Sequence, residues 1–138
     1  MRVLFILIIM LFLHVFADYH LQGILATLKQ KSAWPQKPQD NIFRFDYKAA
    51  LAAHAFEWSF IITLPCLISI WHACTDLSWP NIKIGAIYIM MLIMNAIFHH
   101  AADDLKANEK TINLTVDQIF HVVQIFITWL IWTITVGW

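Results

Sequence analysis

Residues 3–22 read VLFILIIMLFLHVFADYHLQ, an unbroken apolar run from Val3 to Leu13 that is followed by His14 and Asp18. Such a run is typical of a transmembrane helix, because a transmembrane strand shows polar and apolar residues in alternation. Positions i and i+4 lie on one face of an α-helix, so we expect His14 and Asp18 to face the same direction. The segment therefore predicts a membrane helix that carries two ionisable side chains.

The composition of the whole chain indicates a membrane protein. Hydrophobic residues make up 60% of the 138 residues and charged residues only 13%, whereas charged residues make up about a quarter of an average soluble domain. We predict an all-α integral membrane bundle of four transmembrane helices, near residues 3–25, 48–73, 84–105 and 115–137, since each block is long enough to cross about 30 Å of hydrocarbon. They form a single transmembrane domain over residues 1–138, with a basic loop at residues 26–47.

The first apolar block also resembles a secretory signal peptide. Arg2, the apolar run and the residues from Val15 to Ala17 match its basic region, its apolar core and its cleavage site. The apolar character continues through residues 21–28, beyond that site. We therefore expect a membrane helix here.

Basic residues are distributed unevenly between the two sides of the predicted bundle. Four helices place both termini on one side, and the side with the first and third loops then holds seven basic residues against two. The seven are Lys29, Lys31, Lys37, Arg44, Lys48, Lys106 and Lys110, and the two are Arg2 and Lys83. The positive-inside rule predicts cytoplasmic first and third loops and periplasmic termini in a bacterial inner membrane.

Acid and imidazole side chains one helical turn apart occur three times in the apolar blocks. The pairs are His14 with Asp18, His99 with Asp103, and Asp117 with His121. At a rise of about 1.5 Å per residue, all three pairs and His54 fall in the cytoplasmic half of the bilayer. Independent surface residues would not share one depth, so we predict one polar cavity at the cytoplasmic end of the bundle.

The three carboxylates in these pairs need partners, because an unpaired charge in hydrocarbon costs roughly 2.5–3.5 kcal/mol. Imidazole and carboxylate groups are ligands of zinc and related divalent ions, which helical bundles bind between facing helices. We predict a divalent metal site, with zinc as the favoured ion and with His14, Asp18, His99, Asp103, Asp117 and His121 as ligands. A metal-free polar or proton-relay network and purely structural pairing stay open as alternatives.

Four further residues have predicted roles around this site. We expect His54 to act as a ligand or general base, and Lys106 to stabilise an anionic group of a substrate. Gln22 and Gln118 are expected to orient the ligands through hydrogen bonds. Gln118 also fits a capping box with Thr115 at the start of the last helix.

The order of these motifs resembles an uncharacterised family of small four-helix membrane proteins of bacteria and their phages. The resemblance covers nearly the whole chain and rests on four motifs. These are His14-x3-Asp18-x3-Gln22, a histidine near the start of the second helix, His99-x3-Asp103-x2-Lys106, and Asp117-Gln118-x2-His121. This chain has Trp58 where that family often has a second histidine, one turn after the first. The resemblance implies no activity, but a more distant similarity to membrane-bound metal-dependent hydrolases implies a reaction class by analogy.

Metal-dependent hydrolysis of a lipid or lipid-linked phosphate is the leading functional hypothesis. A divalent ion activates water and polarises a phosphoryl or acyl oxygen, and the depth of the site favours a membrane substrate. Expected partners are a membrane lipid and a lipid-linked substrate but no nucleic acid, and a homo-oligomer stays open. The alternative is a non-enzymatic bacterial or phage membrane regulator, or a proton- or cation-handling protein, that uses the same buried polar network.

Overall fold

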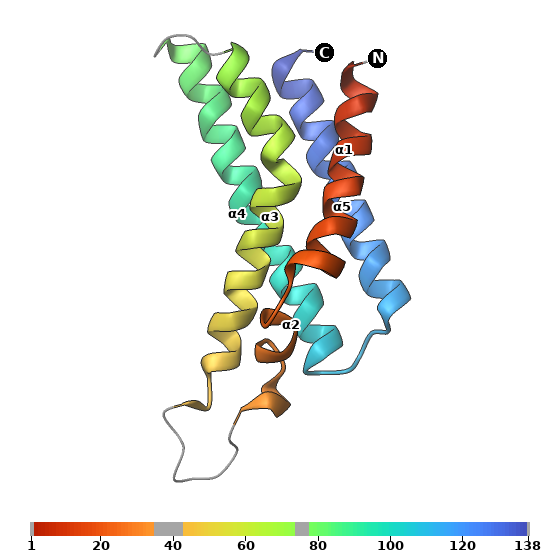
Figure 1. The fold of residues 1–138 in the computed structure, drawn as a ribbon. Coiled ribbons are helices and arrows are strands. Elements are labelled where there is room, and N and C mark those ends of the chain that lie inside the picture. The colour runs from red at the N-terminus through yellow and green to blue at the C-terminus, as the bar shows by residue number, and fades with distance from the viewer. Residues whose placement is uncertain (1, 35–42, 74–77, 138) are drawn as a thin grey trace.

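The computed structural model describes residues 2–34, 43–73 and 78–137 and has four long apolar helices (Figure 1). They are α1 (Arg2–Phe16), which continues through the π-helical turn η1 (Ala17–Leu21), α3 (Asp46–Ala73), α4 (Trp79–Ala107) and α5 (Leu114–Val136). The segments that can span a membrane are Val3–Leu21, Asp46–Trp71, Pro80–Ala107 and Leu114–Val136. The predicted all-α bundle of four membrane helices is confirmed.

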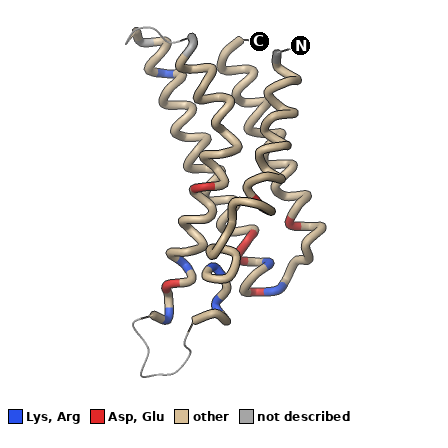
Figure 2. The backbone as a smooth tube through the Cα atoms, viewed as in Figure 1, with Lys and Arg blue, Asp and Glu red and all other residues tan. Residues whose placement is uncertain are grey.

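The helices form a closed ring in the order α1, α3, α4, α5, and each packs mainly against its two neighbours. Both chain termini lie at one end of the bundle (Figure 1). Figure 2 shows that most charged residues lie toward the opposite end. The bundle is thus divided into an apolar end and a charged end, as the depth argument from the sequence requires.

The first helix ends before the boundary that the apolar pattern predicts. Gly23 adopts a positive φ of 49°, which glycine tolerates without strain, and the chain leaves the helix axis there. It then forms the short helix α2 (Leu25–Leu28) and the 3₁₀ turn η2 (Lys31–Ala33), and α2 packs against α3. Part of the predicted basic loop is therefore folded back onto the bundle. Residues 35–42 of that loop lie outside the described residues.

Helix α5 begins with a cap that the sequence analysis assigned wrongly. The Asn113 side chain accepts a hydrogen bond of 3.0 Å from the backbone N–H of Val116, so Asn113 is the N-cap residue. Thr115 then lies inside the first turn, and the capping box that it was predicted to form with Gln118 does not exist. Asparagine caps helices well because its short side chain reaches the free donors of the first turn. Here the Asn113 side chain accepts from Val116, so the helix begins at Leu114, before Thr115.

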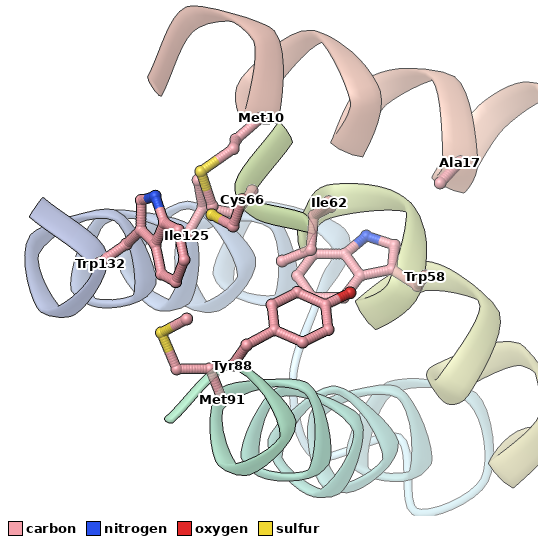
Figure 3. Packing of buried hydrophobic residues seen from close by; sticks show 9 residues of the cluster. All are labelled: Met10, Ala17, Trp58, Ile62, Cys66, Tyr88, Met91, Ile125 and Trp132. Atoms are coloured by element: carbon pink, nitrogen blue, oxygen red, sulfur yellow. The ribbon is translucent and has the colours of Figure 1, made fainter. Parts of the chain in front are cut away.

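Buried apolar side chains from all four helices pack against one another, mostly on the terminal side of the cluster histidines, and Figure 3 shows this packing. They include Met10 from α1, Ile62 and Cys66 from α3, Met91 from α4 and Ile125 from α5. The outer surface is also apolar, with many exposed Phe, Ile, Leu and Val side chains, as suits contact with lipid tails. The ionisable side chains that are buried therefore lie in one compartment on the other side of this core.

We predict that Asn113→Ala destabilises the protein by about 1 kcal/mol, the usual cost of losing an N-cap side chain. Thr115→Ala is the matched control and should change stability by less than about 0.5 kcal/mol, since this exposed side chain caps nothing. Unfolding of the detergent-solubilised protein by increasing SDS, followed by circular dichroism, measures both. If Thr115→Ala lowers the stability more than Asn113→Ala does, Asn113 is not the cap.

Candidate metal centre

Seven buried histidine and aspartate side chains from four helices meet at the charged end of the bundle. We call them the His/Asp cluster: His14, Asp18, His54, His99, Asp103, Asp117 and His121. Each is at most 8% exposed. Asp18 lies in the π-helical turn η1, a widened helical geometry that often occurs at functional sites. The predicted polar residues are therefore buried together, and every predicted metal ligand belongs to the cluster.

Three donor atoms of the cluster form a compact triangle between α3 and α4. His54 Nε2 lies 3.2 Å from His99 Nε2 and 3.3 Å from Asp103 Oδ2. His99 Nε2 lies 3.8 Å from the same Asp103 oxygen. Ligands that bind zinc at about 2.0–2.2 Å in a tetrahedron are separated by roughly 3.3–3.6 Å. The three separations in the triangle, 3.2, 3.3 and 3.8 Å, lie within about 0.2 Å of this range.

A second set of donors surrounds His121 on α5. Its Nε2 atom lies 3.3 Å from Asp117 Oδ1, 3.9 Å from Asp103 Oδ1 and 4.0 Å from Asp18 Oδ2. One imidazole nitrogen is thus faced by oxygens of three carboxylates that come from three different helices. Within the described residues, the groups Asp18, His54, His99 and His99, Asp103, His121 each place their donor atoms within 4.8 Å of one another and can hold a metal ion.

Within the described residues, five buried nitrogen and oxygen atoms of the cluster have no hydrogen-bond partner: Asp18 Oδ1, Asp117 Oδ1, His99 Nδ1 and both ring nitrogens of His121. Buried polar atoms in native proteins are almost always paired, and an unpaired one costs about 1–3 kcal/mol. Of these five atoms, Asp18 Oδ1 lies 3.8 Å from His54 Nε2, and Asp117 Oδ1 lies 3.3 Å from His121 Nε2. Divalent cations bound at these two places would satisfy Asp18 Oδ1, Asp117 Oδ1 and His121 Nε2, so the residues present fit a divalent ion.

His14 lies at the wall of the cluster, with both ring nitrogens engaged. Its Nδ1 accepts a hydrogen bond of 3.0 Å from Trp58 Nε1, and its Nε2 donates to Gln118 Oε1 at 3.1 Å. Gln118 Nε2 in turn donates to Asp18 Oδ2 at 3.1 Å. Gln118 therefore links a histidine to a carboxylate by hydrogen bonds. Gln22 differs, because it donates to the backbone carbonyl of Asp18 and to no side chain of the cluster.

Trp58 has a role that the sequence analysis did not assign. It is fully buried, and its ring stacks on the His99 ring at 4.2 Å between centroids and 14° between planes. Its N–H holds His14, as described above. The signal was its position one turn after His54, which places both side chains on the same helix face.

Two lysines pair with the carboxylates, and only one of them was predicted to lie here. Lys106 bonds to Asp117 Oδ2 and lies 3.7 Å from Asp103 Oδ1. Lys29 is 5% exposed, and its Nζ lies 2.5 Å from Asp103 Oδ2. The sequence placed Lys29 in the basic loop, and the turn at Gly23 brings it back into the bundle. No sequence pattern around Lys29 distinguishes it from the other loop lysines.

A comparison of the chain with protein-family models, curated proteins and solved structures found no match.

We predict that Lys29→Met destabilises the protein by about 3–5 kcal/mol when a chelator is present. The reason is that removing one partner of a buried ion pair leaves an uncompensated charge on Asp103. Lys48→Met, at an exposed position, is the control and should have an effect below about 0.5 kcal/mol. SDS-induced unfolding again gives the difference. Equal stability of the two variants would contradict the buried pair.

Proposed function

We propose that this protein is a divalent-metal-dependent hydrolase of the bacterial inner membrane that acts on a lipid or lipid-linked phosphate, with zinc as the favoured ion. The observation that carries this proposal is the set of unpaired, buried donor atoms in the His/Asp cluster. The arrangement of basic residues supports periplasmic termini and a cluster on the cytoplasmic side.

The distances divide the proposed roles among the residues. His54 Nε2 belongs to the compact donor triangle, which favours the ligand role over that of a general base. We assign metal binding to His54, His99, His121 and the three carboxylates. His14 is assigned a positioning role, since Trp58 and Gln118 already occupy its nitrogens.

When bound, a divalent ion supplies Lewis acidity for water activation and for polarising a phosphoryl oxygen. The chain contributes buried, oriented ligands and positive charge near the substrate. Lys106 is the more exposed of the two lysines, with 25% of its side chain accessible. We propose that its ammonium group contacts the anionic head group of the substrate, as predicted from the sequence.

A groove of about 560 Å³ between α4 and α5 supports a lipid substrate. Its walls are almost entirely apolar and include Met90, Met94, Phe98, Phe120 and Ile127. The groove also reaches Ala102 and Leu105, the chain neighbours of Asp103 and Lys106. It lies at membrane depth on the two helices that supply most of the cluster. We propose that the hydrocarbon chain of the substrate lies in this groove while its head group enters the cluster.

A second candidate function is a non-enzymatic membrane regulator. Lys29 and Lys106 already pair with Asp103 and Asp117, and such pairs can fix one helix arrangement without a metal. A continuous proton or cation pathway has less support, because the other end of the bundle is filled by the apolar core. The resemblance to the uncharacterised bacterial and phage family stays a prediction and supports either function.

We predict that detergent-purified protein, loaded with zinc and desalted, retains zinc. The double variant His99→Ala with His121→Ala should retain at least about tenfold less, because it removes a ligand from each donor set. His20→Ala with His100→Ala is the matched control, since both histidines lie outside these sets. Elemental analysis measures the content. Wild-type protein without bound metal under these conditions would refute the proposal and favour the regulator.

We also predict that Met94→Trp, which fills the groove, raises the Kd for dioleoyl phosphatidic acid about tenfold, or roughly 1.4 kcal/mol. Ile93→Trp is the control, an exposed neighbour on α4 that does not line the groove. Native mass spectrometry in detergent measures the bound lipid. A short-chain dihexanoyl phosphatidic acid should bind both variants alike. Equal loss of the long-chain lipid in both variants would remove the groove from the proposed function.

A further inference from the structure

The two oxygens of Asp103 face different histidines. Oδ2 lies 3.3 Å from His54 Nε2 and 3.8 Å from His99 Nε2. Oδ1 lies 3.9 Å from His121 Nε2, on the side of α5. One carboxylate therefore stands between the triangle on α3 and α4 and the donor set on α5. A carboxylate that presents one oxygen to each of two donor sets has the arrangement of a bridging ligand.

Asp18 repeats this arrangement from α1. Its Oδ1 lies 3.8 Å from His54 Nε2 and has no hydrogen-bond partner. Its Oδ2 lies 4.0 Å from His121 Nε2 and accepts a hydrogen bond from Gln118. The same two donor sets are thus connected by a second carboxylate, which comes from a different helix and is more than nine-tenths buried.

We propose that the His/Asp cluster binds two divalent cations, with Asp18 and Asp103 each bridging both. His54 and His99 complete the first position, and Asp117 and His121 complete the second. We place His99 in the first position because its Nε2 lies 3.2 Å from His54 Nε2. The proposal rests on the metal binding proposed above and adds the number of ions and the division of the ligands.

Each position then has four protein donors, two of its own and one from each bridging aspartate. The first offers two imidazole nitrogens and two oxygens, and the second offers one nitrogen and three oxygens. Neither set needs Lys29 to leave, because a carboxylate oxygen has two lone pairs. Asp18 Oδ1, Asp117 Oδ1 and His121 Nε2, three of the five cluster atoms that have no hydrogen-bond partner within the described residues, receive a cation in this arrangement.

The charge of this arrangement identifies the class of substrate. Three carboxylates carry three negative charges, and the two lysines that pair with them offset two. With imidazoles neutral, as metal ligands must be, two divalent ions leave the cluster with an excess of three positive charges. Such an excess within the bilayer requires anions. A phosphate mono- or diester fits best, since paired ions bind both the attacking and the leaving oxygens of a phosphoryl group.

Manganese is a suitable probe because it can be counted and is paramagnetic. Full-length protein in detergent is loaded with Mn²⁺, desalted and analysed for metal. We expect about two ions per chain in the wild type and in the control His100→Ala, and about one in His54→Ala and in His121→Ala. Size-exclusion chromatography and SDS unfolding verify that each variant is folded. A wild-type content of one ion overturns the pair but keeps the proposed function, whereas no bound metal overturns both.

Electron paramagnetic resonance tests the bridges without relying on the alanine variants. Two manganese ions joined by carboxylates give an exchange-coupled spectrum, whereas isolated ions give six-line spectra. We expect coupling in the wild type. In Asp18→Asn, which keeps the shape of the side chain, we expect the coupled signal to fall by at least about tenfold. Two ions with uncoupled spectra in the wild type would overturn the bridging roles of Asp18 and Asp103.

Discussion

The arrangement of the charged end depends on one constraint: three carboxylates are buried at membrane depth, where water does not compensate their charge. Around Asp18, Asp103 and Asp117 the chain gathers nearly all of its buried cationic and imidazole groups. It uses lysines from two sources, a helix end and a loop that folds back. Because Asp18 Oδ1 and Asp117 Oδ1 still have no hydrogen-bond partner, these groups do not satisfy the carboxylates completely. The proposed cations would supply the positive charge that these two oxygens still lack.

The apolar end of the bundle limits the cluster to one side of the membrane. The core between Met10 and Trp132 separates the cluster from the side of the membrane that holds the termini. Trp58 lies at the junction, with its ring against His99 and its N–H on His14. The Trp58 ring therefore packs in the apolar core, while its N–H donates a hydrogen bond to His14 of the cluster. A buried polar cluster that the apolar core closes off on one side suits the proposed chemistry at one membrane surface better than passage across the membrane.

The sequence predicted the helices and the cluster because both follow from periodic rules. Apolar runs of sufficient length predict spans, and a four-residue spacing read at helical rise predicts that His14, His99 and His121 share one depth. Lys29 was not predictable in this way, since its burial depends on the positive φ of Gly23 and on tertiary contacts of the folded-back segment. The cap of α5 was assigned wrongly because Asn113 and Thr115 both carry capping side chains, and the sequence alone does not decide between two caps that lie so close.

The folded-back segment belongs to the site as much as the long helices do. Asn108, directly after α4, accepts from the backbone N–H of Lys31 at 2.7 Å and donates to the carbonyl of Lys29 at 3.2 Å. The backbone around Lys29 is thereby attached to the end of α4, and the Lys29 ammonium reaches Asp103, five residues before Asn108. The backbone carbonyl of Lys29 is thus held by Asn108, directly after α4, and its ammonium by Asp103 of α4. Its position is therefore fixed relative to the carboxylate that stands between the two donor sets. A loop lysine held in this way acts as a permanent counter-charge of Asp103, and this allows one carboxylate to face three histidines within the bilayer.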